Sequence, residues 1–174
     1  MTSDEQSLQR NAPTMDVFGA VDWKEQRLSS DSSVIVTPCR PIEFRLLEVQ
    51  IPFEPSSYVE DSDRKNVFFE AKNAEVVAFL QHVEDTLAET GAMVNSCLAK
   101  EGMLRCKVSL KQVRVFDSNR CATDAPQKFA GWTCNALVKL IGRWQTQDGG
   151  ASGLNLQATD IQLLRPYQRE CRPF

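Results

Sequence analysis

GWTCNALVKLIGRW, residues 131–144, and LNLQATDIQLL, residues 154–164, decide the fold. Both segments are long, rich in aliphatic and β-branched residues and free of proline, as extended strands are. The connection between them, residues 145–153, is polar and rich in glycine, which is typical of a hairpin. We therefore predict two long antiparallel strands over 132–144 and 154–164, with Pro166 ending the second.

The sequence before this hairpin predicts shorter strands and one helix. Strands are expected at Val34–Val36, Ile42–Phe53 and Asn66–Ala71, which are apolar segments separated by prolines or by a charged loop at 54–65. Asn73 is a suitable N-cap for a helix, with Gly91 at its C-terminal end. The apolar positions of this helix recur at helical spacing, at Val76, Leu80, Val83 and Leu87. His82 and the acidic residues are expected on its solvent face, namely Glu75, Glu84, Asp85 and Glu89.

From Leu104 the hydrophobic period changes to two. Leu104, Cys106 and Val108 alternate with Arg105 and Lys107, so one face of this strand is apolar and the other is basic. The phase of the alternation reverses at the next two valines, which predicts a bulge or a strand end near residue 112.

These elements predict a mostly β protein with one main helix, an α+β chain. Long bent strands with an inserted helix favour an OB-like antiparallel barrel, and a β-sandwich is the alternative. We expect a mobile acidic arm at 1–32, an OB-like nucleic-acid-binding domain at 33–166 and a basic C-terminal tail at 167–174. An N-terminal segment that packs over the core is the alternative to the arm.

The charge is divided between the two halves of the chain. Residues 1–103 contain 9 basic and 18 acidic residues, whereas residues 104–174 contain 11 basic and 5 acidic residues. The basic half also contains two of the three tryptophans and the predicted long strands. This combination is typical of a surface that holds a polyanion and stacks on its bases, so the sequence favours single-stranded nucleic acid as the ligand.

The candidate contact residues are the cations and aromatics of the basic half. They are Arg105, Lys107, Lys111, Arg114, Lys128, Phe129, Trp132, Lys139, Arg143 and Trp144. The two tryptophans share the apolar parity of their strand, so they are either core residues or stacking residues. Gly142 is expected to permit either a close backbone approach or a tight bend of the strand, and the bend is favoured.

Other chemistries find little support in the sequence. Six cysteines lack a C-x-x-C pair and the chain has a single histidine, which disfavours a zinc site and a Cys/His or Ser/His nucleophile. We expect that the protein is not an enzyme and that it binds no metal or cofactor. Asp61 and Asp63, in the charged loop, are a weak candidate for a metal site. No secretory signal or long apolar run is found, so the chain is expected to be intracellular, with reduced and mostly buried thiols.

Two blocks of sequence carry a family resemblance. The first contains PIEF at 41–44, LEVQIPF at 47–53 and NAEVVAFL at 73–80; the second is GWTCNALVKLIGRW with GLNLQATDIQLL, at 131–144 and 153–164. Over residues 35–165 they resemble OB-fold single-stranded-DNA-binding proteins of large DNA viruses and phages. The resemblance implies a role in DNA replication, repair or recombination. RNA is a second candidate ligand, and both a monomer and an oligomer are consistent with the sequence.

The chain departs from that family at its C-terminus. Many such proteins end in an acidic tail that recruits partners, whereas this chain ends RPYQRECRPF, residues 165–174. Replication or recombination proteins are then expected to bind the N-terminal arm or Phe174. A non-catalytic scaffold subunit, whose basic face meets an acidic protein, is the alternative function.

Overall fold

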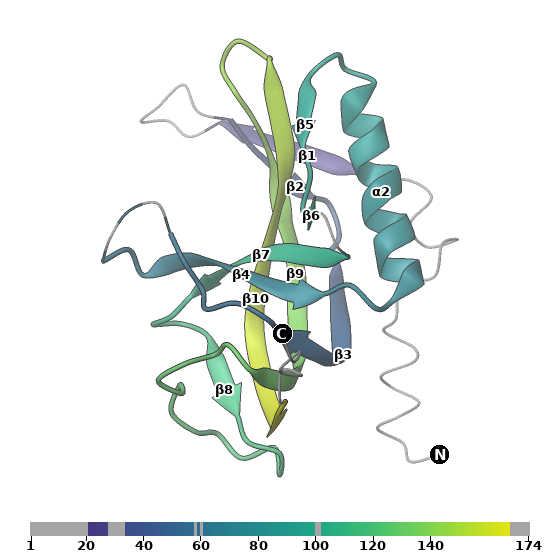
Figure 1. The fold of residues 1–174 in the computed structure, drawn as a ribbon. Coiled ribbons are helices and arrows are strands. Elements are labelled where there is room, and N and C mark those ends of the chain that lie inside the picture. The colour runs from purple at the N-terminus through teal and green to yellow at the C-terminus, as the bar shows by residue number, and fades with distance from the viewer. Residues whose placement is uncertain (1–20, 28–33, 58, 60, 100–101, 168–174) are drawn as a thin grey trace, which may run out of the picture.

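The computed structural model describes residues 21–27, 34–57, 59, 61–99 and 102–167. Within these residues the chain is mostly β with one helix, as predicted (Figure 1). The N-terminal strands are β1 (Trp23–Arg27), β2 (Val34–Pro38), β3 (Glu43–Ile51) and β4 (Arg64–Glu70). Helix α2 (Ala74–Ala88) follows, and then β5 (Met93–Asn95), β6 (Leu98–Ala99), β7 (Met103–Ser109), β8 (Arg114–Phe116), β9 (Trp132–Gln145) and β10 (Ala151–Pro166).

The β9–β10 hairpin is the centre of the fold and confirms the prediction from the sequence. The two strands pair antiparallel from Ser152↔Gln145 to Pro166↔Trp132 and run through the length of the molecule (Figure 1). Alternate residues of β9 enter the core, from Cys134 to Leu140. The register shifts at three places along β10, and such irregularities bend and twist a strand, which gives this hairpin its curvature.

The other strands are arranged around this hairpin. The order along the hydrogen-bonded path is β1-β2-β9-β10-β7-β4, and β3 pairs with β9. β5 and β8 pair with β10 in parallel, and β6 pairs with β7. The path does not return from β4 to β3, although the Gln50 amide donates to the Glu70 carboxylate at 2.7 Å across that boundary.

Helix α2 begins and packs as predicted, with one exception. Asn73 is the N-cap and accepts hydrogen bonds from the amides of Glu75 and Val76. The predicted apolar positions are buried, but so is Glu84, which is 4% exposed rather than solvated. Its carboxylate accepts the Ser96 hydroxyl at 2.6 Å and the Cys97 amide at 2.7 Å, and so ties the helix to the loop before β6.

The N-terminal segment differs from the predicted arm where it is described. β1 pairs antiparallel with β2, and Val21 and Trp23 pack against the core. Residues 21–27 therefore match the alternative, a segment that packs over the domain. The rest of the predicted arm, residues 1–20 and 28–32, and Phe174 in the predicted tail lie outside the described residues.

Gly142 serves a close backbone approach and also lies at an irregularity of the strand. Asn155 pairs with Gly142 and Leu156 with Leu140, and such a register shift bends a strand, as expected here. A Cβ at this position would collide with the carbonyl oxygen of Val36, because β2 crosses β9 here. A glycine is needed wherever two backbones come this close.

β7 ends at Ser109 and a turn leads to β8, so of the two features expected near residue 112, a bulge or a strand end, the structure shows the strand end. The Val113 amide donates to the Ser109 carbonyl at 2.8 Å in this turn. Val115 returns to the core from β8, which accounts for the reversed phase of the alternation.

Cys97, Cys106 and Cys134 are buried free thiols, while Cys39 and Cys121 are exposed. Burial raises the pKa of the Cys97 and Cys106 thiols, and raises that of Cys134 to about 12, so these groups stay protonated at neutral pH. In the part of the chain that is described, no helix is long and apolar enough to cross a membrane.

Candidate nucleic-acid interface

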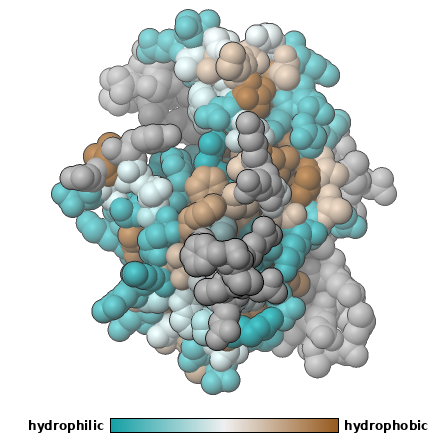
Figure 2. Space-filling view, in the orientation of Figure 1, coloured by the Kyte–Doolittle hydropathy of each residue, from teal (hydrophilic) through white to brown (hydrophobic). Residues whose placement is uncertain are grey.

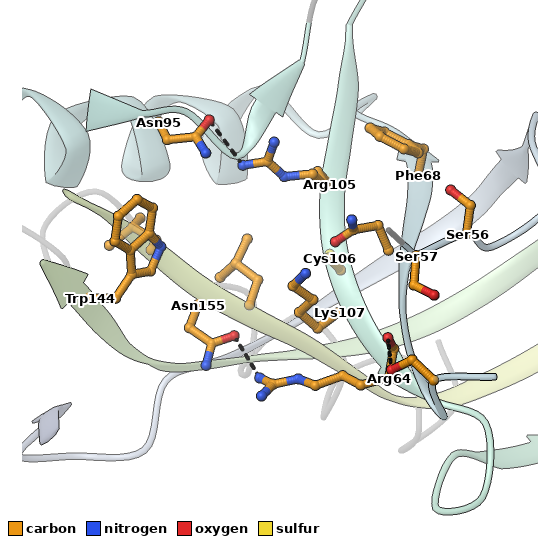
Figure 3. Close-up of a pocket in the computed structure, with 14 residues that line it drawn as sticks. Ser56, Ser57, Arg64, Phe68, Asn95, Arg105, Cys106, Lys107, Trp144 and Asn155 are labelled. Atoms are coloured by element: carbon orange, nitrogen blue, oxygen red, sulfur yellow. Dashed lines mark hydrogen bonds between the residues drawn. The ribbon is translucent and has the colours of Figure 1, made fainter. Parts of the chain in front are cut away.

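Five strands (β4, β5, β7, β9 and β10) and the 54–63 loop line a hollow of about 710 Å³, here called the basic groove. Its lining residues are Ser56, Ser57, Ser62, Arg64, Asn66, Phe68, Asn95, Arg105, Cys106, Lys107, Trp144, Leu154, Asn155 and Leu156. Figure 3 shows Trp144 at one end and Phe68 near Ser56 at the other, with the basic side chains between them. The loop is held against β4 by paired backbone hydrogen bonds between Ser56 and Asn66.

The β4–β7 register brings the groove residues together. Val67 and Phe69 of β4, and Leu104 and Cys106 of β7, are buried in the core. Because side chains alternate along a strand, their neighbours fall on the opposite face. Antiparallel pairing then sets Phe68 opposite Arg105 and Asn66 opposite Lys107, while Arg64 lies further along β4.

The two arginines of the basic groove have neutral partners. Arg64 donates to the Asn155 side chain at 3.2 Å, and Arg105 donates to the Asn95 side chain at 3.4 Å (Figure 3). Arg105 also donates to the Ser96 carbonyl at 3.1 Å. Neither they nor Lys107 form an ion pair with a described acidic residue, and the described lining contains no Asp or Glu. Partial burial and the positive charges of Arg64 and Arg105 lower the pKa of Lys107 below its ordinary value. Among the described residues, the groove thus gathers three positive charges with no acidic side chain between them.

Aromatic side chains stand at both ends of the basic groove. Trp144 is 39% exposed, although it follows the core-facing parity of β9, because the strand runs past the end of the core. Phe68 packs edge-to-face on Phe53, which is 46% exposed, with ring centroids 6.2 Å apart. Elsewhere on the side drawn in Figure 2 the described surface is largely hydrophilic, with hydrophobic residues in small groups. The groove therefore has an aromatic surface at each end, and aromatic surfaces are groups on which unpaired bases can stack.

Of the predicted contact residues, the structure brings Arg105, Lys107 and Trp144 together in the groove. Three other predicted cations are neutralised outside it, in the pairs Lys139–Glu43 (3.1 Å), Arg143–Glu25 (3.9 Å) and Arg114–Asp160 (2.8 Å). Arg143 also lies over the Trp23 ring, 5.4 Å from its centroid. Lys139 and Arg143 have the outward parity of β9, opposite to that of Trp144.

The remaining predicted residues lie away from the basic groove. Phe129 is a correction, because it is only 3% exposed and belongs to the core, so it has no face to offer a base. Trp132 is half-buried and packs against the core. Lys111 and Lys128 are exposed and do not line the groove.

Arg64 and Phe68 are groove residues that the sequence reasoning missed. The predicted strand began at Asn66, which left Arg64 in the charged loop. The observed strand RKNVFFE starts two residues earlier, and its period-two pattern sets Arg64, Asn66 and Phe68 on one face. That alternation was the signal that could have found them.

Asp63, the weak metal candidate, has a structural role. Its carboxylate accepts hydrogen bonds from the Ser109 hydroxyl and, at 2.7 Å, from the Lys111 amide. The bond from Ser109 first, and then the amide and charge of Lys111, lower the pKa of Asp63 against an opposing effect of desolvation. Within the described ranges, no group of three or more His, Cys, Asp or Glu residues could hold a metal ion.

Comparison with solved structures finds distant similarities to two phage proteins. The chain is similar to the single-stranded-DNA-binding protein of bacteriophage Enc34 in complex with single-stranded DNA, at 10% identity and a TM-score of 0.49, over 86% of this chain and 98% of that one. It is also similar to gp2.5, a single-stranded-DNA-binding protein encoded by bacteriophage T7, at 13% identity and a TM-score of 0.49, over 75% and 90% of the two chains.

No protein-family model matches the sequence. A comparison with curated protein sequences finds no significant match either.

Proposed function

We propose that this protein binds single-stranded DNA in the basic groove, without sequence preference and without turnover. One observation supports this above all others. Arg64, Arg105 and Lys107 converge with no described acidic residue among them, while the cations elsewhere on β8 and β9 are ion-paired. Unneutralised positive charge beside exposed aromatic rings suits a ligand that carries both phosphates and unpaired bases.

The groove geometry suggests how such a strand would bind. Phosphates would lie along Arg64, Arg105 and Lys107, and the two arginines would exchange neutral partners for charged ones. Bases at the two ends would stack on Trp144 and Phe68, and each stacking contact contributes about 1–3 kcal/mol. The side chains of Asn95 and Asn155 both donate and accept hydrogen bonds, so they tolerate any base.

The same geometry favours a single strand over a duplex. Bases in a duplex are stacked on one another and paired, so their faces are closed to Trp144 and Phe68. Only the phosphate contacts would remain, and these depend strongly on salt.

We further propose that β3, β4, β7, β9 and β10 act together as an OB-like barrel that coats DNA during replication, repair or recombination. The Gln50–Glu70 hydrogen bond between β3 and β4 supports closure at the boundary that lacks a backbone ladder. The barrel places its bent strands and the 54–63 loop around one face, as nucleic-acid-binding barrels do.

Fluorescence anisotropy of a labelled oligo-dT tests the proposal. Unlabelled oligo-dT should displace the label, whereas a DNA duplex of the same length and an acidic polypeptide should displace it at least tenfold less well. A single-stranded RNA competitor then shows whether the protein prefers DNA or RNA. If the acidic polypeptide competes best, the protein is a scaffold for an acidic partner and the proposal fails. Cleavage of the oligonucleotide in the presence of Mg²⁺ would contradict the absence of turnover.

A further inference from the structure

Gly153 lies directly opposite Trp144 in the β9–β10 pairing. A Cβ atom on Gly153 would lie 2.8 Å from Cε2, Cζ2 and Nε1 of the indole, which is closer than carbon and nitrogen atoms approach without repulsion. The Trp144 ring therefore lies against the backbone of β10, in space that only a glycine leaves open.

The backbone of Gly153 does not itself require glycine. Gly149, in the same hairpin, has a φ of 72°, in the left-handed region that favours this residue. Gly153 has no such torsion and continues an extended strand that pairs with β5 as well as β9. A glycine inside a strand also weakens it by about 0.5–1 kcal/mol relative to alanine. The structure explains the glycine at position 153 by the space that it leaves for the Trp144 indole.

The position of the indole connects this contact to the basic groove. Gly153 is buried beneath the ring, while Trp144 remains 39% exposed and lines the groove together with Asn95, the β5 neighbour of Gly153. One side of the ring is thus covered by the strand, and the rest is open to the groove.

We propose that Gly153 is a positioning residue, which seats the Trp144 indole against β10 so that its open surface receives a base. This inference rests on the proposed binding of single-stranded DNA. A ring already held in its bound orientation loses little conformational freedom when a base stacks on it, and such preorganisation increases affinity. Gly153→Ala should force the ring out of this seat without removing any group that contacts the ligand.

The test is a double-mutant cycle on oligo-dT affinity in the full chain. Trp144→Ala should weaken binding about 5- to 150-fold, the equivalent of one lost stacking contact. Gly153→Ala should cause a substantial part of that loss, reduce the quenching of tryptophan fluorescence by the DNA, and leave the salt dependence unchanged. In the Trp144→Ala background, Gly153→Ala should have no further effect on affinity. Gly150→Ala is the matched control, since a Cβ there meets only the flexible Asp148 side chain, at 3.2 Å.

The outcomes separate this inference from the proposed function. If the wild-type protein fails to bind oligo-dT at low salt, the proposed function fails and the inference with it. If the wild type binds but Gly153→Ala matches it in affinity and quenching, only the inference fails. Equal losses from Gly153→Ala in both backgrounds would mean that Gly153 acts through the strand rather than through Trp144, which also overturns it. Thermal melting of each variant shows whether it is folded.

Discussion

Phe68 and Arg105 lie opposite each other on the antiparallel strands β4 and β7, with a flat ring and a guanidinium on the same outer face of the sheet. Two residues further along, Asn66 faces Lys107. The register therefore sets an aromatic ring and an amide on β4 opposite two cations on β7. This arrangement is the structural basis of the proposed binding groove.

Replacement of the groove cations should weaken binding and flatten its salt dependence. Arg64→Gln, Arg105→Gln and Lys107→Gln each remove one phosphate contact. For a single strand, the slope of log K against log salt changes by about 0.7 per phosphate contact, so each variant should lose about that much. Anisotropy titrations with oligo-dT at several salt concentrations measure both effects.

Lys139→Gln and Arg114→Gln are the matched controls for those variants. Both side chains are exposed cations of the same half of the chain, but each is ion-paired with an acidic residue outside the groove. Their removal should leave affinity and slope within error of the wild type. A loss as large as that of the groove variants would mean that net charge, rather than the groove, determines binding.

Trp144 should be the source of any fluorescence signal from bound DNA. Trp144→Phe retains an aromatic ring, so affinity should fall by no more than several-fold while most of the DNA-induced quenching disappears. Trp132→Phe should keep the quenching, because Trp132 packs against the core away from the groove. Quenching that follows Trp132 instead would refute the assignment of Trp144 as the stacking residue.

Binding should weaken in alkaline solution because of Lys107. Burial and the nearby arginines lower the pKa of this amine in the free protein, and a bound phosphate raises it again. Between the two values binding takes up a proton, so affinity is constant at lower pH and decreases as the pH rises through the free-state pKa, which lies below 10.5.

Lys107→Arg should abolish that decrease, because a guanidinium stays charged. The measurement is the Kd for oligo-dA from about pH 7 to about pH 9.5, since thymine itself loses a proton in alkaline solution. Lys139→Arg serves as the control and should keep the wild-type profile. The same decrease in Lys107→Arg as in the wild type would show that another group titrates.

The buried carboxylate of Glu84 should stabilise the fold. Glu84→Ala leaves the Ser96 hydroxyl and the Cys97 amide without their acceptor, which should cost about 2–3 kcal/mol in the free energy of unfolding. Asp85→Ala, at an exposed position on the same helix, should cost less than about 0.5 kcal/mol. Urea denaturation compares the two, and equal midpoints would contradict a structural role for Glu84.

The elements with strong local signals could be predicted from the sequence. The helix with its cap at Asn73 and the long β9–β10 hairpin appear as expected, because period and capping chemistry are properties of neighbouring residues. The predicted location of Glu84 on the solvent face of the helix is wrong. Its partners, Ser96 and Cys97, come from a loop that helical periodicity does not describe.

The candidate site could be predicted only in part, because it depends on strand pairing. Arg105 and Lys107 followed from the alternation within one strand. Arg64 and Phe68 required the register of β4 on β7, which is set by contacts distant in the sequence. The ion pairs of Lys139 and Arg143 likewise depend on acidic partners on β3 and β1, which no local pattern indicates.

The salt dependence of oligo-dT binding by the wild-type protein tests the central claim most directly. Three unneutralised cations in one groove predict binding at low salt that weakens with a log–log slope of about −2, and a slope near zero for the variant with Arg64, Arg105 and Lys107 all changed to Gln. No binding of oligo-dT at low salt, or a slope that is unchanged in the triple variant, would contradict the account.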